Sequence, residues 1–141
     1  MQVPVIKYYN SSIDKPQFCF YILCKGLNSG KPLEAPIPNC FIAICETQIQ
    51  RDYFFWLIYG IFHTRVFKND LIGSVIPFLR IGDFKKRLSK AFSNTCKRPD
   101  NFSKAVCAMK DHYEQATKIN ELMKQKQAIL QATLKFHILA S

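Results

Sequence analysis

The 141-residue chain is poor in acidic side chains, with 10 Asp and Glu residues against 20 Lys and Arg. The acidic residues are scattered, and they form no paired-carboxylate motif of the kind that general acid–base catalysis uses. The three histidines, His63, His112 and His137, fall in three separate segments. These absences predict a protein that is not an enzyme. A nuclease-like enzyme whose carboxylates converge only in the fold is the weaker alternative.

Long apolar runs and glycine-rich phosphate loops are absent as well. The longest apolar run, residues 53–62, has ten residues, whereas a helix that crosses a membrane needs about 20. The amino-terminal residues lack the basic and apolar segments of a signal peptide, so we expect a cytoplasmic protein without a membrane partner. Asn28-Ser29-Gly30-Lys31-Pro32 runs into proline, and therefore does not match a phosphate-binding loop between strand and helix.

Six cysteines are present, and in a reducing compartment we expect them to be free thiols. Cys19 and Cys24 have the same spacing as Cys40 and Cys45, which suggests a zinc site. Both pairs lie in strand-like runs, however, where residues five apart point to opposite faces. Zinc sites usually take their cysteines from turns, at shorter spacing. Cysteines that pack as small hydrophobic side chains are the better interpretation, and we expect neither metal nor cofactor.

Aromatic and β-branched residues indicate where the strands lie. Residues 17–25 and 39–46 are typical of strands, and we expect them to be neighbours in a sheet. Thr47 and Gln50 form a capping-box pattern, which predicts a buried aromatic helix over residues 48–66. A long buried strand is the alternative for this segment, because periodicity alone does not separate the two.

Proline ends the helical pattern after the aromatic segment. Residues 75–81 are predicted to be extended, because Pro77 excludes a continuous helix. Gly82 and Asp83 then cap a short helix, residues 84–92, which has one apolar and one basic face.

A polar loop over residues 93–100 precedes a long helix, which contains neither glycine nor proline. The alternating residues 134–139 predict a final edge strand. The fold class is therefore α+β: a small antiparallel sheet with a buried aromatic helix, a short basic helix and a long C-terminal helix. We expect one domain, residues 1–141. Its four parts are an extended arm or edge strand (residues 1–16), an α+β body (residues 17–100), the long helix (residues 101–132) and a strand or tail (residues 133–141).

Basic residues concentrate in one stretch of the chain. Between Arg80 and Lys104 there are eight basic and two acidic residues, which place +6 of the net +10 within 25 residues. A helix face and loop with this charge predict salt-dependent contacts with a phosphate backbone. The loop of residues 26–38 offers groups that reach a groove, or is a solvated connector. The predicted nucleic-acid-binding residues are Lys25, Asn28, Ser29, Lys31, Arg80, Lys85, Lys86, Arg87, Lys90, Lys97 and Arg98.

The long helix has a stripe of mainly apolar residues at a heptad-like spacing. Asn120 and Gln127 fall on this stripe, where polar residues weaken a coiled coil but fix its register and partner number. The stripe predicts contact with the body of the protein, with a second copy of the chain, or with both. Its residues are Val106, Met109, Tyr113, Ala116, Asn120, Met123 and Leu130.

Several segments occur in a familiar order: Tyr21-Ile22-Leu23-Cys24-Lys25-Gly26 before a glycine-containing loop, then Phe62-His63-Thr64-Arg65-Val66-Phe67, and then Gly73-Ser74-Val75-Ile76-Pro77-Phe78-Leu79-Arg80-Ile81-Gly82-Asp83. With these segments, residues 18–130 resemble the target recognition domains of type I restriction–modification specificity subunits. The resemblance implies an α+β domain that reads duplex DNA, with the long helix as spacer and subunit contact. Gly73, Ser74, Pro77 and Asp83 would be scaffold residues. A full specificity subunit has two such units, and this chain has one.

These features together predict a homodimeric DNA-binding module that reads duplex DNA without catalysis. The alternative is an interaction protein that does not bind DNA. Such a protein would dock on a larger protein of a restriction–modification system or a mobile genetic element through its long helix.

Overall fold

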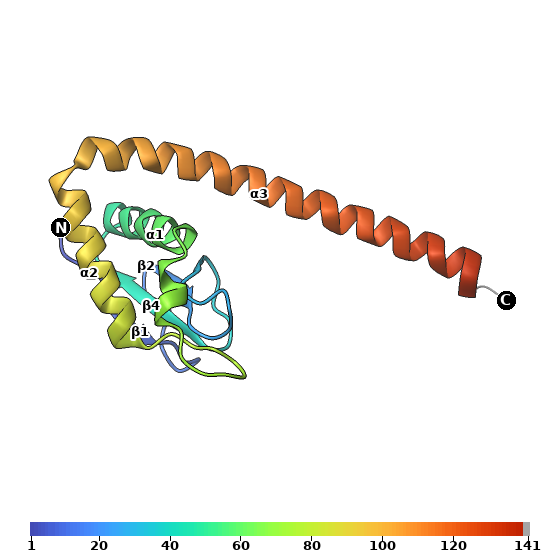
Figure 1. The fold of residues 1–141 in the computed structure, drawn as a ribbon, viewed down its shortest axis with the longest axis horizontal. Coiled ribbons are helices and arrows are strands. Elements are labelled where there is room, and N and C mark those ends of the chain that lie inside the picture. The colour runs from blue at the N-terminus through green and yellow to red at the C-terminus, as the bar shows by residue number, and fades with distance from the viewer. Residues whose placement is uncertain (140–141) are drawn as a thin grey trace. The chain divides into compact units, whose positions relative to one another are not determined.

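The protein has the predicted α+β fold in a computed structural model that describes residues 1–139. Residues 1–103 form one compact unit, and a second unit begins at Lys104. The first unit contains a four-stranded antiparallel sheet with the strand order β1-β4-β2-β3. Figure 1 labels three of these strands, β1, β2 and β4. Its strands are β1 (Val5–Tyr8), β2 (Phe18–Leu23), β3 (Pro32–Leu33) and β4 (Cys40–Cys45).

The two predicted strands are confirmed as the neighbours β2 and β4. Phe20 lies opposite Ala43, and Tyr21 lies opposite Ile42. Successive side chains point to opposite faces of a sheet, yet all four of these side chains are buried. The sheet is therefore covered on both faces, which explains why these strands are apolar throughout.

Helices cover one face of the sheet. Phe20 packs edge-on against Phe55 of α1 (Gln48–His63), with ring centroids 5.5 Å apart. Phe41 packs against Phe84 of α2 (Ile81–Lys97), also at 5.5 Å. These contacts place both helices over the centre of the sheet.

The amino-terminal arm covers the other face. Its edge strand β1 pairs with β4, which confirms the edge-strand interpretation of the arm. After β1, Tyr9 and Ile13 pack against a buried cluster of Tyr21, Cys40 and Ile42.

The predicted capping residues begin α1, so this segment is a helix and not a strand. Thr47 Oγ1 accepts a hydrogen bond of 3.1 Å from the Gln50 amide. The Gln50 side chain accepts from the Glu46 amide at 2.7 Å and donates to the Gln2 carbonyl at 2.6 Å, which fastens the helix to the arm. The predicted helix end at residue 66 is wrong: α1 ends at His63, because Arg65 has left-handed backbone angles and precedes the 3-10 helix η1 (Val66–Asp70).

The short basic helix is longer than predicted. Gly82 and Asp83 are not its cap, since α2 already begins at Ile81 after the N-cap residue Arg80. The predicted polar loop over residues 93–100 is also wrong, because α2 continues to Lys97. The Thr95 hydroxyl donates to the Phe92 carbonyl of its own helix at 3.0 Å and lies 2.6 Å from the Tyr53 hydroxyl of α1, so this polar side chain is satisfied within a helix.

The predicted edge strand over residues 134–139 is wrong as well. The long helix α3 (Pro99–Leu134) passes directly into a π-helical turn, η2 (Lys135–Leu139). A helix satisfies its own backbone hydrogen bonds, whereas a strand requires a neighbour. The last two residues of the predicted tail lie outside the described residues. Up to Leu139, no helix has both the length and the apolar character that a bilayer crossing requires.

Replacing Gly30 by alanine tests the close packing of the loop between β2 and β3. Gly30 has φ +97°, and an added Cβ would lie 2.2 Å from Cδ2 of the buried Phe67 ring. We expect Gly30→Ala to lower the free energy of unfolding by about 3 kcal/mol, as left-handed strain and overpacking add. Urea denaturation measures the loss.

Gly26→Ala is the matched control. Gly26 has φ +98°, but no atom lies within 4 Å of its added Cβ, so only the backbone cost of about 1–2 kcal/mol remains. Equal losses in the two variants would contradict the steric role of Gly30.

Candidate nucleic-acid interface

The helix α2 presents a row of lysines to solvent. Its buried face holds Phe84 and Leu88 in the core, while Lys86, Lys90 and Lys97 are exposed. At 3.6 residues per turn, these three positions fall within about 40° around the helix axis. They span about 16 Å along the axis at 1.5 Å per residue. We refer to Lys86, Lys90 and Lys97 as the α2 lysine row.

Two of the three predicted arginines of this region, Arg80 and Arg87, are engaged in ion pairs. Arg87 donates to both carboxylate oxygens of Asp70, at 2.7 and 3.0 Å, and this hydrogen bonding raises the pKa of Arg87. Arg80 donates to Asp83 at 2.9 Å. These carboxylates neutralise much of the positive charge of the two arginines. Lys85, Lys97 and Arg98 are exposed.

A hollow of about 240 Å³ lies where α2 meets η1. Three cations and two carboxylates line it; Arg87 is paired with Asp70, whereas Lys86 and Lys90 form no ion pair with a described residue. The lining residues are Asp70, Asp83, Lys86, Arg87 and Lys90.

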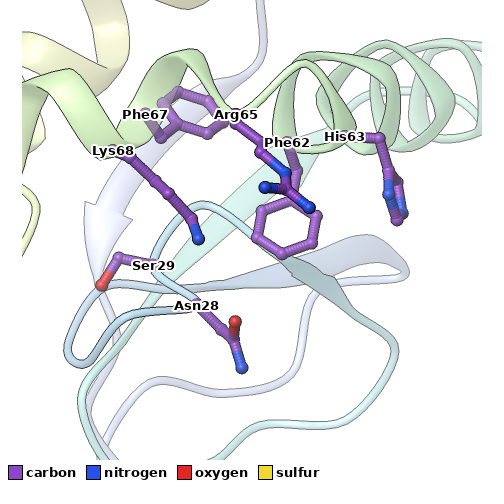
Figure 2. A pocket seen from close by; sticks show the side chains of 7 residues that line it. All are labelled: Asn28, Ser29, Phe62, His63, Arg65, Phe67 and Lys68. Carbon is purple, nitrogen blue, oxygen red and sulfur yellow. The ribbon is translucent and has the colours of Figure 1, made fainter.

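A second hollow, of about 180 Å³, contains the predicted loop residues Asn28 and Ser29. Figure 2 shows the side chains of Arg65 and Lys68 reaching toward it across from Asn28. We call this the Arg65 hollow; its lining residues are Asn28, Ser29, Phe62, His63, Arg65, Phe67 and Lys68. None of these residues is acidic.

The loop at the Arg65 hollow is held by short hydrogen bonds. Ser29 is buried, and its hydroxyl donates to the Gly26 carbonyl at 2.6 Å. The Gly30 amide donates to the Leu23 carbonyl, and the Gly26 amide to the Pro77 carbonyl, both at 2.7 Å. The Ser29 hydroxyl is thus used to shape the turn, whereas Asn28 is exposed.

The predicted binding residues do not form one continuous site in the structure. The two hollows share no lining residue, and Lys25 and Lys31, although exposed, line neither of them. η1 separates the hollows, with Lys68 on one side and Asp70 on the other.

Arg65 and Lys68 are not among the binding residues predicted from the sequence. Arg65 fell inside the predicted helix over residues 48–66, and the left-handed turn that redirects its side chain leaves no mark in the sequence. The sequence feature that could have indicated this site is a pair of cations three residues apart, directly after an apolar helix.

In the second unit, the predicted contact residues of α3 lie on the surface. No residue of α3, all of which is described, is buried. Val106, Met109, Tyr113 and Ala116 are partly exposed, and Asn120 is fully exposed. Met123 and Leu130 are 63% and 51% exposed.

The cysteines of the sheet region are mainly core residues, as predicted. All six cysteines are free, and Cys24, Cys40 and Cys45 are buried. Burial raises the pKa of each of these three thiols, and that of Cys45 to about 11. Over residues 1–139, no three His, Cys, Asp or Glu side chains gather as a metal site would require.

The described units are a small α+β domain and a long helix. The chain belongs to a family of unknown function, DUF6943, whose model matches residues 6–136. The match includes the sheet except for Val5, both hollows and the whole of α3. No curated protein and no solved structure matches the chain.

Thiol labelling tests the burial of the cysteines. Cys96 and Cys107 are exposed and should react with iodoacetamide rapidly at pH 8. Cys45 should react at least about 100-fold more slowly, because a pKa raised from 9.0 to about 11 lowers the reactive thiolate fraction tenfold per unit. Its rate should rise with pH up to about 11, and Cys24 and Cys40 should also be protected.

Mass spectrometry of the labelled chain counts the reacted thiols. Full labelling in denaturant is the control. Rapid labelling of the three buried thiols in the folded protein would contradict their burial.

Proposed function

We propose that the protein is a nucleic-acid-binding module that contacts the backbone of duplex DNA through α2, without catalysis. The observation that carries the proposal is the α2 lysine row, a set of exposed cations on a helix anchored in the core. Among the described residues, no carboxylate forms an ion pair with these three lysines. Lysines that lack protein partners are available to replace counterions along a phosphate backbone.

The charge of the first unit supports a polyanionic ligand. Residues 1–103 contain 14 Lys and Arg and 7 Asp and Glu residues, a net charge of +7. A net charge of this size accelerates association with polyanions. Cytoplasmic residence, which we also propose, is compatible with six free thiols.

Duplex DNA is favoured over other polyanions by the resemblance to target recognition domains. The loop that contains Gly73, Ser74 and Pro77 lies between η1 and α2, and its residue Val75 is 91% exposed. Lysine contacts with phosphates fix the position of a protein on DNA but do not read bases. Base contacts would therefore come from exposed loops such as this one.

A second proposal concerns α3, and we propose a second copy of the chain as its partner. Helices in proteins owe most of their stability to packing of an apolar face, yet Ile119, Leu122 and Met123 are 56%, 59% and 63% exposed. The heptad spacing continues through Leu130 to Leu134, and a paired helix would cover it. In a parallel pair, Asn120 would meet Asn120 of the second copy and fix the register.

Docking on a larger protein of a restriction–modification system or a mobile element would use this same face of α3. Such a protein would then replace the second copy.

Neutralising the α2 lysine row tests DNA binding. We expect the Lys86→Ala, Lys90→Ala and Lys97→Ala triple variant to bind a fluorescent duplex more weakly in an anisotropy titration. The slope of log K against log salt should fall by about 0.9 for each phosphate that the variant no longer neutralises, or about 2.7 for three phosphates.

A triple variant of α3 provides the charge-matched control. Lys118→Ala, Lys124→Ala and Lys126→Ala remove the same charge from the second unit and should leave the slope unchanged. Absence of wild-type binding at low salt, or equal losses in both variants, would contradict the proposal.

Oligomeric state tests the α3 proposal. Light scattering should give about twice the chain mass of 16.4 kDa for the wild type and the chain mass for Met123→Lys. Gln125→Lys adds the same charge two residues away, off the heptad stripe, and should remain dimeric. A monomeric wild type, or equal effects of the two variants, would contradict pairing through α3.

A further inference from the structure

We propose that the Arg65 hollow binds a phosphate monoester, either of a free nucleotide or at the end of a nucleic-acid strand. The hollow holds two cations, Arg65 and Lys68, and the side-chain amide of Asn28 (Figure 2). It shares no residue with the α2 lysine row. The site therefore goes beyond the proposed backbone contacts, and either one can fail without the other.

The charge of the hollow matches a phosphate monoester. Such a group carries about −1.5 to −2 charges near neutral pH and has three strong acceptor oxygens. Both cations are exposed, and neither forms an ion pair with any described residue. With no acidic lining residue, the hollow has a positive charge that is available to an anionic ligand.

The donor types distinguish phosphate from a carboxylate ligand. A guanidinium presents a planar fork that engages two oxygens, and an ammonium acts as a point charge on a third. A carboxylate has a single negative charge, so it would balance only one of the two cations, Arg65 and Lys68. A phosphate monoester uses both cations and can also accept from the Asn28 amide.

The size of the hollow indicates that it holds a group and not a whole ligand. Pockets that enclose entire small ligands measure about 300–1,000 Å³, and this one measures about 180 Å³. A nucleoside would therefore extend outward from the bound phosphate. Figure 2 shows the Phe62 ring beside the Arg65 guanidinium, where it offers an apolar contact for a sugar or base.

Backbone hydrogen bonds fix the main chain at Arg65 and Lys68. Arg65 has φ 65°, a conformation that is uncommon for residues other than glycine and that often occurs at binding sites. Its amide donates to the Phe62 carbonyl at 3.0 Å, and its carbonyl accepts from the Lys68 amide at 3.1 Å. This turn brings Arg65 and Lys68 to the same hollow.

Calorimetric titration of the full chain tests the proposal with defined probes. The probes are inorganic phosphate, adenosine monophosphate, adenosine, and one single-stranded oligonucleotide with either a 5′-phosphate or a 5′-hydroxyl. We expect adenosine monophosphate to bind and adenosine not to, or the 5′-phosphate to tighten oligonucleotide binding by about tenfold. The first result identifies a free nucleotide as ligand, and the second a strand end. Both support the site.

Substitutions then locate the binding. Lys68→Ala and Arg65→Asn should each weaken phosphate-dependent binding by about tenfold or more, as expected when a charged hydrogen bond is removed. Asparagine is chosen because it tolerates the left-handed backbone of position 65. Arg65→Lys keeps the charge without the fork and should give an intermediate loss. Lys31→Ala, on the same loop as Asn28, and the α2 triple variant should bind phosphate as the wild type does.

Two results would overturn the proposal. One is equal binding of phosphorylated and unphosphorylated probes by the wild type. The other is an unchanged affinity in both Lys68→Ala and Arg65→Asn, with thermal melting used to show that both variants fold.

Discussion

The packing of Phe67 is the constraint on which the rest of the functional surface depends. Its ring is 1% exposed and stacks on Phe84 of α2, with centroids 5.5 Å apart. On its other side it meets the backbone of Gly30 so closely that no side chain fits there. One ring thereby joins η1, α2 and the loop after β2, and it fixes the parts that form the two hollows.

The two sides of η1 differ because of where one carboxylate lies. Asp70 ends η1 toward α2 and takes the full fork of Arg87, so this arginine serves structure more than ligand binding. Lys68 lies at the other side, where no carboxylate is present among the lining residues. The same short helix therefore separates a hollow that contains carboxylates from one that contains none. Net charge alone does not show this difference, because it does not say which cations are already paired with carboxylates.

Local chemistry predicted those parts of the fold that depend on neighbouring residues. The apolar runs gave β2 and β4, and Thr47 with Gln50 marked the start of α1, because strand pleating and helix capping are short-range effects. The failures have long-range causes. The helix around Thr95, for example, packs on α1, where the Thr95 hydroxyl meets that of Tyr53, 42 residues earlier. When the distant residue that contacts it is unknown, a polar stretch of sequence is predicted to be a loop.

The candidate site was less predictable than the fold for the same reason. Lys86 and Lys90 could be found from their spacing, because a helix face is a local property, whereas Lys97 was predicted in a loop. The pairing of Arg87 with Asp70 spans 17 residues, and the meeting of Asn28 with Arg65 depends on the packing of Gly30 against Phe67. Charge density in the sequence thus overestimated the arginines of α2 and overlooked Arg65 and Lys68.

The two units present different chemistry to a partner. In the first, apolar side chains are used in a core that holds cations in defined places, so its surface suits an anionic ligand. In the second, α3 has no buried residue, and its apolar side chains are available for another helix. From Lys104 on, the chain has six Lys residues and three Asp and Glu residues, a net charge of +3, so we expect a helix pair to be held mainly by apolar contacts. Salt should therefore affect the two surfaces in opposite ways: it weakens phosphate contacts and relieves repulsion between like-charged helices.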